Sequence, residues 1–142
     1  MSWLIDTNAL SELKKRRPHP GVARWFTQHS AGSLHLSVLT LGELRKGIDA
    51  MAEGSRKASF RDWLETEVPD YFAGRILDID TRTADRWGRL CAEARRPLPA
   101  IDSLLAASAL VHGLTLVTRN LADFTLPSLR VVNPWERQAG EE

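Results

Sequence analysis

Acidic residues stand at four widely separated places in this 142-residue sequence, next to segments that the residue pattern predicts to be strands or helix starts. The first place is the clearest, because the apolar run Trp3–Ile5 ends in Asp6 and two small polar residues follow it. Carboxylates are oxygen ligands of the kind that Mg²⁺ and Mn²⁺ prefer, so acids that meet in the fold could hold such an ion. The four acids are Asp6, Glu43, Asp102 and Asp123.

Strands and helices are predicted to alternate along the chain. Short apolar or alternating runs predict strands, and apolar residues at three- and four-residue spacing predict helices. The predicted strands cover residues 3–5, 34–38, 75–79, 114–118 and 129–132. The predicted helices cover residues 9–17, the region around 22–26, a segment opening at 40, residues 57–72, a segment capped by Asp80, and residues 103–112. The segment capped by Asp80 is predicted to bury Ala84, Trp87, Leu90 and Ala94. With no hairpin signal, this order predicts an α/β fold with a parallel sheet between two helical layers.

The predicted sheet brings the acids to one edge. Ligands bind outside the carboxyl ends of the strands in open parallel sheets. Asp6 and Asp123 follow strands, and Glu43 lies one turn into the helix after a strand. Asp102 opens a helix that leads into the next parallel strand, so this helix must start at the same edge. Several carboxylates on one edge repel each other unless a cation neutralises them.

Three of the acids also have a structural interpretation. Thr40-x-x-Glu43 has the pattern of a capping box, and Asn120-x-x-Asp123 has a related form. Asp102 fits an N-cap or a first-turn acid, which the helix dipole favours. Each of these residues could therefore stabilise a helix instead of binding a ligand.

Asp6 has two alternatives of its own. It could simply end its strand, with Thr7 or Asn8 capping the helix that follows. It could also be the nucleophile of a phosphatase that uses a strand-end aspartate. Such an enzyme would carry a second acid two residues further on, where this sequence has Asn8.

Composition excludes several other classes of protein. The 19 basic and 18 acidic residues nearly cancel, so a nucleic-acid role would need a local basic patch. The single cysteine, Cys91, cannot form an internal disulfide, and no Cys/His cluster predicts zinc. No phosphate-binding glycine loop, dinucleotide fingerprint or nucleophile elbow is present. Without a signal peptide or a long apolar run, we expect a cytoplasmic protein with no membrane contact.

Basic residues gather in two places that are candidates for contact with phosphates. Lys14–Arg17 is a run of four basic residues stopped by Pro18, and its alternative is a solvated helix end where cations complement the dipole. Arginines also cluster around the helix that follows Asp80, where they could line an RNA groove or form a solvated helix surface. The candidates outside the run are Lys46, Arg82, Arg86, Arg89, Arg95, Arg96 and Arg119.

Four segments together resemble the PIN-domain family, and specifically the VapC-type toxin ribonucleases of type II toxin–antitoxin pairs. The segments are LIDTNALSEL, LSVLTLGELRKGI, LPAIDSLLAASALVHGLTLVTRNLADF and VVNPW. A short motif such as DTN says little alone, but the four occur together in the family's order and separations. The resemblance implies one PIN domain over residues 1–142, with a PIN-like three-layer α/β/α fold. We expect residues from about 136 to 142 to be a frayed polar tail.

The resemblance also implies an activity and its residues. VapC-type toxins are endoribonucleases that hydrolyse RNA phosphodiester bonds and depend on Mg²⁺ or Mn²⁺. By position, Asp6, Asp102 and Asp123 resemble metal ligands, and Glu43 resembles the second acid, which binds metal or orients the attacking water. The polar residues Thr7, Asn8, Thr118 and Asn120 resemble those that surround the acids in the family.

The family further implies a homodimer and a cognate VapB-type antitoxin that blocks the active site. The alternative is a degenerate PIN module that binds RNA or protein without catalysis. The intact set of four acids favours the catalytic interpretation.

Overall fold

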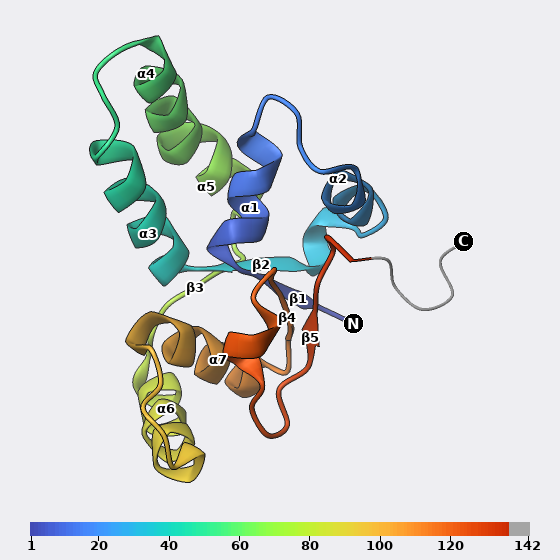
Figure 1. Ribbon diagram of the computed structural model, residues 1–142, viewed down its shortest axis with the longest axis vertical. Coiled ribbons are helices and arrows are strands. Elements are labelled where there is room, and N and C mark those ends of the chain that lie inside the picture. Colours follow the sequence, from blue (N-terminus) through green and yellow to red (C-terminus); the bar gives the residue numbers. More distant parts are fainter. Residues whose placement is uncertain (137–142) are drawn as a thin grey trace.

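A five-stranded parallel sheet forms the middle layer of the chain in a computed structural model that describes residues 1–136 (Figure 1). The strand order is β3-β2-β1-β4-β5, and every neighbouring pair is parallel. The strands are β1 (Trp3–Ile5), β2 (Leu34–Ser37), β3 (Ile76–Leu77), β4 (Thr115–Val117) and β5 (Val131–Val132). This arrangement confirms the predicted α/β fold.

Helices cover both faces of the sheet (Figure 1). One layer holds α1 (Thr7–Lys14), α2 (Pro20–Thr27), α3 (Val38–Asp49), α4 (Ser55–Asp62) and α5 (Val68–Tyr71). The other layer holds α6 (Thr81–Ala94) and α7 (Ala100–His112), which pack against each other. Short helical turns complete the described chain, namely η1 (Ala31–Ser33), η2 (Trp63–Glu67) and η3 (Leu121–Phe124).

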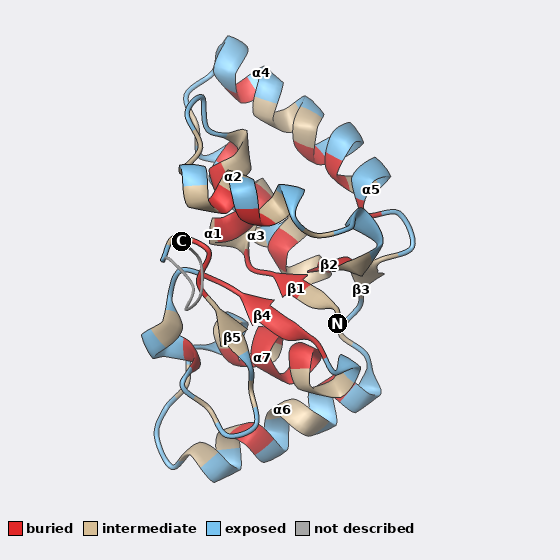
Figure 2. Cartoon of the chain, turned by 90° about the vertical axis from the view of Figure 1, so that its right-hand side faces the viewer, coloured by how far each residue is buried: buried red, intermediate tan, exposed pale blue. Residues whose placement is uncertain are grey.

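The two central strands divide the core into two clusters. Ile5 and Val117 pack with the apolar faces of α1–α5, whereas Leu4 and Leu116 pack with α6 and α7. Successive side chains of a strand point to opposite faces, so neighbouring residues of β1 and β4 pack against different helical layers. Figure 2 shows these strands as buried segments between the half-exposed helices. The first central strand therefore holds Asp6, the residue after it, rigidly at the sheet edge.

Several predicted boundaries were wrong. The first helix begins at Thr7 and ends at Lys14, so it starts earlier and ends earlier than predicted. The predicted helix over 57–72 is divided by a π-helical turn, η2, between α4 and α5. Its apolar stripe nevertheless packs into the core as predicted. In α6, Ala84 is exposed although the pattern predicted burial, while Leu90 is fully buried.

Two predicted helix ends were confirmed. Asp80 is the N-cap of α6, and its Oδ1 accepts the Thr83 N–H at 2.9 Å and the Thr83 hydroxyl at 2.8 Å. Gly113 ends α7 with a φ of 66°, a left-handed conformation that glycine adopts at little cost. Within residues 1–136, none of the helices combines the length and the apolar character needed to cross a bilayer. The predicted frayed tail lies outside the described residues except for Glu136.

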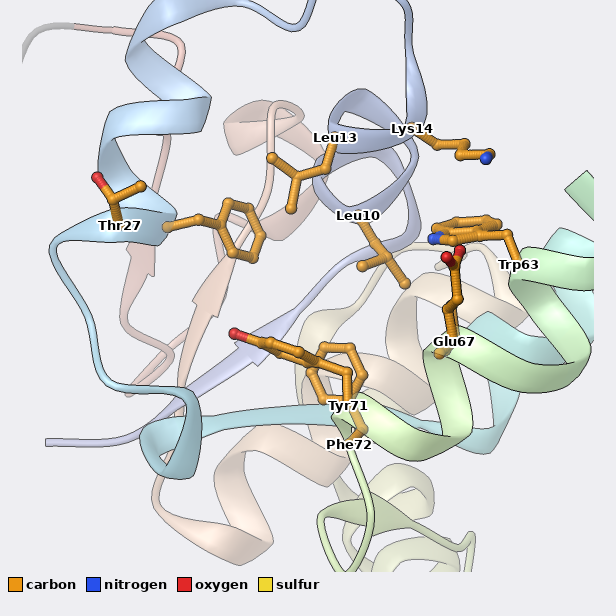
Figure 3. Close-up of a pocket in the computed structure, with 10 residues that line it drawn as sticks. Leu10, Leu13, Lys14, Thr27, Trp63, Glu67, Tyr71 and Phe72 are labelled. Carbon is orange, nitrogen blue, oxygen red and sulfur yellow. The ribbon is translucent and has the colours of Figure 1, made fainter. Parts of the chain in front are cut away.

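An apolar groove of about 580 Å³ lies in the α1–α5 layer (Figure 3). Its walls come from α1, α2, η2 and α5, and Tyr71 on its edge is 46% exposed. The residues that line it are Leu10, Leu13, Lys14, Phe26, Thr27, Trp63, Glu67, Val68, Tyr71 and Phe72.

Candidate active site

Asp6 occupies the junction between β1 and α1 and is only 6% exposed. Its N–H donates to the Val117 carbonyl at 2.9 Å, which continues the pairing of β1 with β4 past the last residue of the strand. Its side chain is the N-cap of α1, because Oδ1 accepts the Thr7 N–H at 2.7 Å. The prediction that Thr7 or Asn8 might cap the helix was therefore wrong, since Asp6 does so itself.

The hydroxyl of Thr118 holds the second oxygen of Asp6. Thr118 is fully buried and follows β4, and its Oγ1 donates to Asp6 Oδ2 at 2.7 Å. The same Oγ1 accepts the Asn8 side-chain N–H at 3.2 Å and the Asn120 N–H at 3.1 Å. One donated and two accepted hydrogen bonds fill the capacity of a hydroxyl. Together with the Thr7 N–H, the fold thus brings all four of the supporting polar residues predicted from the sequence to Asp6.

Asn8 links the two strand ends. Its Nδ2 lies 3.4 Å from Asp6 Oδ2, and its Oδ1 accepts the Arg119 N–H at 3.3 Å. This contact joins the first turn of α1 to the loop that follows β4. The amide therefore fixes the position of Asp6 relative to the loop on which Arg119 stands.

Glu43 reaches the same place from α3. That helix begins at Val38 with Ser37 as its N-cap, because Ser37 Oγ accepts the Leu39 N–H at 3.0 Å. Thr40 lies inside the helix, so the capping-box interpretation of Glu43 was wrong. Glu43 Oε1 instead lies 2.5 Å from the hydroxyl of Thr7, which donates to it.

Asp102 and Asp123 stand on the far side of the site from Glu43's helix. Asp102 is in the first turn of α7, whose N-cap is Pro99, so the first-turn interpretation holds and the N-cap interpretation was wrong. Asp123 is exposed in η3, and the side chain of Asn120 makes no capping hydrogen bond to that turn. The capping form predicted for Asn120 and Asp123 was therefore wrong as well.

The acids influence one another electrostatically. Burial raises the pKa of Asp6, and the negative charges of Asp102 and Glu43 raise it further, against the hydrogen bonds that lower it. Burial also raises the pKa of Asp102, with added contributions from Asp123 and Glu43. A like charge nearby disfavours ionisation, as does loss of water contact. Glu43 and Asp102 therefore lie close enough to Asp6 to affect its ionisation, and Asp123 lies close enough to affect that of Asp102.

This donor set suits a hard divalent cation. The acids supply oxygen atoms alone, and burial with the charges of neighbouring acids makes the ionised forms of Asp6 and Asp102 unfavourable without a counter-charge. Residues 1–136 contain no ready-made cluster of three or more His, Cys, Asp or Glu side chains able to hold a metal. Mg²⁺ keeps several waters and is commonly held by one or two carboxylates, so it does not need such a cluster. Asp6 and Asp102 fit this requirement.

The basic candidates divide into near and distant groups. Lys46 and Glu43 line one groove of about 610 Å³ on α3, which Ile101 borders. The Arg119 guanidinium lies 5.4 Å from the ring centre of Trp135, beside the loop that carries Asn120. Arg82, Arg86 and Arg89 instead line a hollow with residues 110 and 111. That hollow is about 12 Å further along α7 than Asp102, at 1.5 Å per residue.

Two contributions to the site were missed in the sequence. Thr40 was interpreted as a helix cap, but its Oγ1 lies 3.1 Å from Thr7 Oγ1, the hydroxyl that also contacts Glu43. Asn133 holds the loop of Arg119, because its Nδ2 donates to the Arg119 carbonyl at 3.4 Å. The closing VVNPW segment contains Asn133, but the sequence could not show that Asn133 contacts Arg119, which is 14 residues earlier in the chain.

The comparisons with known proteins agree with this geometry. The PIN domain family model matches residues 3–124. The VapC ribonuclease Y4jK of Sinorhizobium fredii is 36% identical over 94% of this chain and 97% of its own. The crystal structure of FitAcB from Neisseria gonorrhoeae has a TM-score of 0.87 at 31% identity, covering 94% of this chain and 99% of that one. A toxin–antitoxin complex from Klebsiella pneumoniae has a TM-score of 0.70 at 26% identity, covering 96% and 100%. The chain belongs to the PIN domain family and, within it, to the VapC-type toxin ribonucleases.

Proposed function

We propose that the chain is the toxin of a type II toxin–antitoxin pair and acts as an endoribonuclease that depends on Mg²⁺ or Mn²⁺. The observation that carries this proposal is the carboxylate of Asp6. It is buried and oriented by two short hydrogen bonds, and its pKa is raised by burial and then by Asp102 and Glu43. Two further acids near a buried carboxylate disfavour its ionised form unless a cation neutralises them, and a structural N-cap gains nothing from them.

Asp6 and Asp102 are the residues that would hold the ion directly, with Asp123 as a third ligand, directly or through water. Each oxygen of Asp6 has a hydrogen-bond donor, and Oδ1, with the Thr7 N–H as its donor, keeps a second lone pair for an ion. A bound divalent cation supplies positive charge to a phosphate oxygen and lowers the pKa of a bound water.

Glu43 is placed to orient the attacking water or to complete the ligand set. Its Oε1 is fixed by the hydroxyl of Thr7, which leaves Oε2 for another partner. Lys46 in the same groove and Arg119 on the neighbouring loop are suited to hold the charged RNA backbone. Hydrolysis would leave a 5′-phosphate and a 3′-hydroxyl.

An assay on total cellular RNA tests this function. The wild type and the variant Asp6→Asn are induced in separate cultures, and the RNA ends are mapped and their chemistry determined. We expect discrete new 5′-phosphate ends with the wild type alone. Identical ends in the variant, or RNA bound by the wild type and never cut, would reject the catalytic proposal and favour the non-catalytic module.

We also propose that the apolar groove of the α1–α5 layer receives a cognate VapB-type antitoxin. The support is twofold. The similar structure from Klebsiella pneumoniae is a toxin–antitoxin complex, and aromatic side chains that stay half-exposed are typical of a surface that a partner covers. An amphipathic antitoxin helix fits such a groove by its apolar face.

We further expect the toxin to be a homodimer. Measuring the mass of the purified protein in solution tests this expectation.

A further inference from the structure

Three basic side chains converge on a second groove, outside the acid site. Lys14 at the end of α1, Arg16 just after it and Arg56 in α4 line a hollow of about 560 Å³. The Lys14 Nζ and the Arg56 guanidinium each lie 5.6 Å from the ring centre of Phe60. Three like charges that share one hollow repel each other, as the acids do in the other site.

In the described part of the chain these three cations form no ion pair, unlike the nearby Lys15, Arg45 and Lys57. Within residues 1–136, no ion pair involves Lys14, Arg16 or Arg56. The neighbouring pairs are Lys15–Glu12 at 2.8 Å, Arg45–Glu65 at 2.9 Å and Lys57–Glu53 at 2.7 Å. Lys14 is the last residue of α1, Lys15 is its C-cap, and Arg16 and Arg17 follow on the exposed surface, so the run lies at a solvated helix end as one interpretation predicted. The shared hollow with Arg56 is what goes beyond that interpretation.

The other residues of the groove suit a nucleotide. Ser55 and Ser59 add hydroxyls, and the hydroxyl of Ser59 already accepts a hydrogen bond from Lys14 at 3.3 Å. Lysine, arginine and serine are the side chains that contact nucleic-acid phosphates. The Phe60 ring now lies beneath the Lys14 and Arg56 cations, and it offers a surface on which a base can stack when these cations turn to a phosphate. An acidic peptide would use the cations but not the ring.

We propose that this groove binds a phosphate, with its adjoining base, of the single-stranded RNA that the acid site cleaves. The inference rests on the proposed ribonuclease function and adds a substrate-binding subsite to it. The helix α1 connects the two places, because Asp6 caps its start and Lys14 ends it. Eight residues separate them, or about 12 Å at 1.5 Å per residue. An extended strand that leaves the acids along α1 would reach the groove within a few nucleotides.

Binding without cleavage tests the groove first. Labelled single-stranded RNA of about 12 nucleotides, within the roughly 4–16 nucleotides that single-strand sites cover, is titrated in EDTA and its intactness checked. The test variant is the triple substitution Lys14→Gln, Arg16→Gln and Arg56→Gln. A groove that holds one phosphate contributes about 0.7 to the slope of log K against log salt, so we expect the magnitude of that slope to decrease by about 0.7 in the variant.

The matched control removes the same charge from α6. The triple substitution Arg82→Gln, Arg86→Gln and Arg89→Gln should leave the salt slope unchanged. Equal slopes in both variants, whether both unchanged or both reduced alike, would overturn the proposal. So would a groove variant that loses binding to a polyglutamate peptide while its RNA slope stays that of the wild type, because the groove would then serve an acidic protein segment.

Cleavage kinetics separate the groove from the acid site. With the same RNA at about 0.15 M salt, the loss of one phosphate contact should raise the KM of the groove variant roughly 4-fold and leave kcat unchanged. A substrate too short to span α1 should show no difference between the variant and the wild type. A changed kcat with an unchanged KM would contradict the subsite. Absence of cleavage in every protein would instead reject the proposed ribonuclease function, and the binding titration would still decide the groove.

Discussion

Replacing Thr118 by valine is the sharpest perturbation of the Asp6 carboxylate, because it keeps the shape of the side chain and removes one oxygen. That oxygen donates to Asp6 at 2.7 Å and accepts from Asn8 at 3.2 Å and from the Asn120 N–H at 3.1 Å. A hydrogen bond to a charged group contributes about 1.5–3 kcal/mol, and an orphaned buried polar group costs about 1–3 kcal/mol. We expect Thr118→Val to lower the free energy of unfolding by about 2–3 kcal/mol at pH 7.

The loss should depend on pH. Burial raises the pKa of Asp6 and the Thr118 hydroxyl opposes that rise, so its removal lets the pKa rise further. A carboxyl whose folded pKa is raised stabilises the protein below its unfolded pKa, and this stability is lost as pH rises through the folded pKa. In the variant, the free energy of unfolding continues to fall to a higher pH, because the folded pKa of Asp6 is higher. A further rise of one in the pKa corresponds to about 1.4 kcal/mol, so the variant's deficit should grow from pH 4 towards pH 8.

Urea unfolding in EDTA, followed by tryptophan fluorescence, measures the deficit at each pH. Thr115→Val is the matched control, because Thr115 is also buried and begins β4, the strand that ends just before Thr118. Unlike Thr118, its hydroxyl has no hydrogen-bond partner within the described chain. This control should be neutral or slightly stabilising, since it removes an unsatisfied polar group. A deficit for Thr118→Val that stays constant with pH, or one matched by Thr115→Val, would show that the Thr118 hydroxyl does not lower the pKa of Asp6.

Three further predictions concern other parts of the chain. Without metal, Asp102→Asn should raise the free energy of unfolding by about 1 kcal/mol. Burial, Asp123 and Glu43 raise the pKa of Asp102, so its negative charge lowers stability above that pKa. Calorimetry at pH 7 should show a melting temperature roughly 3–4 °C higher, and a lower one would contradict this. Leu13→Asp in the apolar groove should prevent co-purification of a co-expressed antitoxin while RNA cleavage persists; a retained complex would argue against that groove. Gly113→Ala should cost about 1 kcal/mol in urea unfolding, because the φ of 66° disfavours a side chain; an unchanged midpoint would contradict it.

The sequence was sufficient for the parts of the site that depend on order along the chain. Alternating strands and helices predicted a parallel sheet, and the carboxyl ends of such strands share one edge, so Asp6 and Asp102 were placed there correctly. The helix start before Glu43 was misjudged because Ser37 and Thr40 are both good caps. The strand ends at the first of them, which no local pattern decides.

The contacts that orient the acids could not be predicted in the same way. Thr118 is 112 residues from Asp6, and only the pairing of β1 with β4 brings them together. The groove around Phe60 likewise depends on how α4 packs near the end of α1, where Lys14 donates a hydrogen bond to Ser59. Residue types at these positions gave no signal until the fold placed them next to each other.

Metal-dependent cleavage of a defined RNA most directly tests the central claim, that Asp6 and Asp102 hold a divalent cation for phosphodiester hydrolysis. The wild type, Asp6→Asn, Asp102→Asn and the surface control Asp85→Asn are stripped with EDTA and assayed as Mn²⁺ or Mg²⁺ is added back. We predict that cleavage returns with metal for the wild type and for Asp85→Asn, and that both site variants stay folded and inactive. Full cleavage by either site variant, or by the wild type in excess EDTA, would contradict the account.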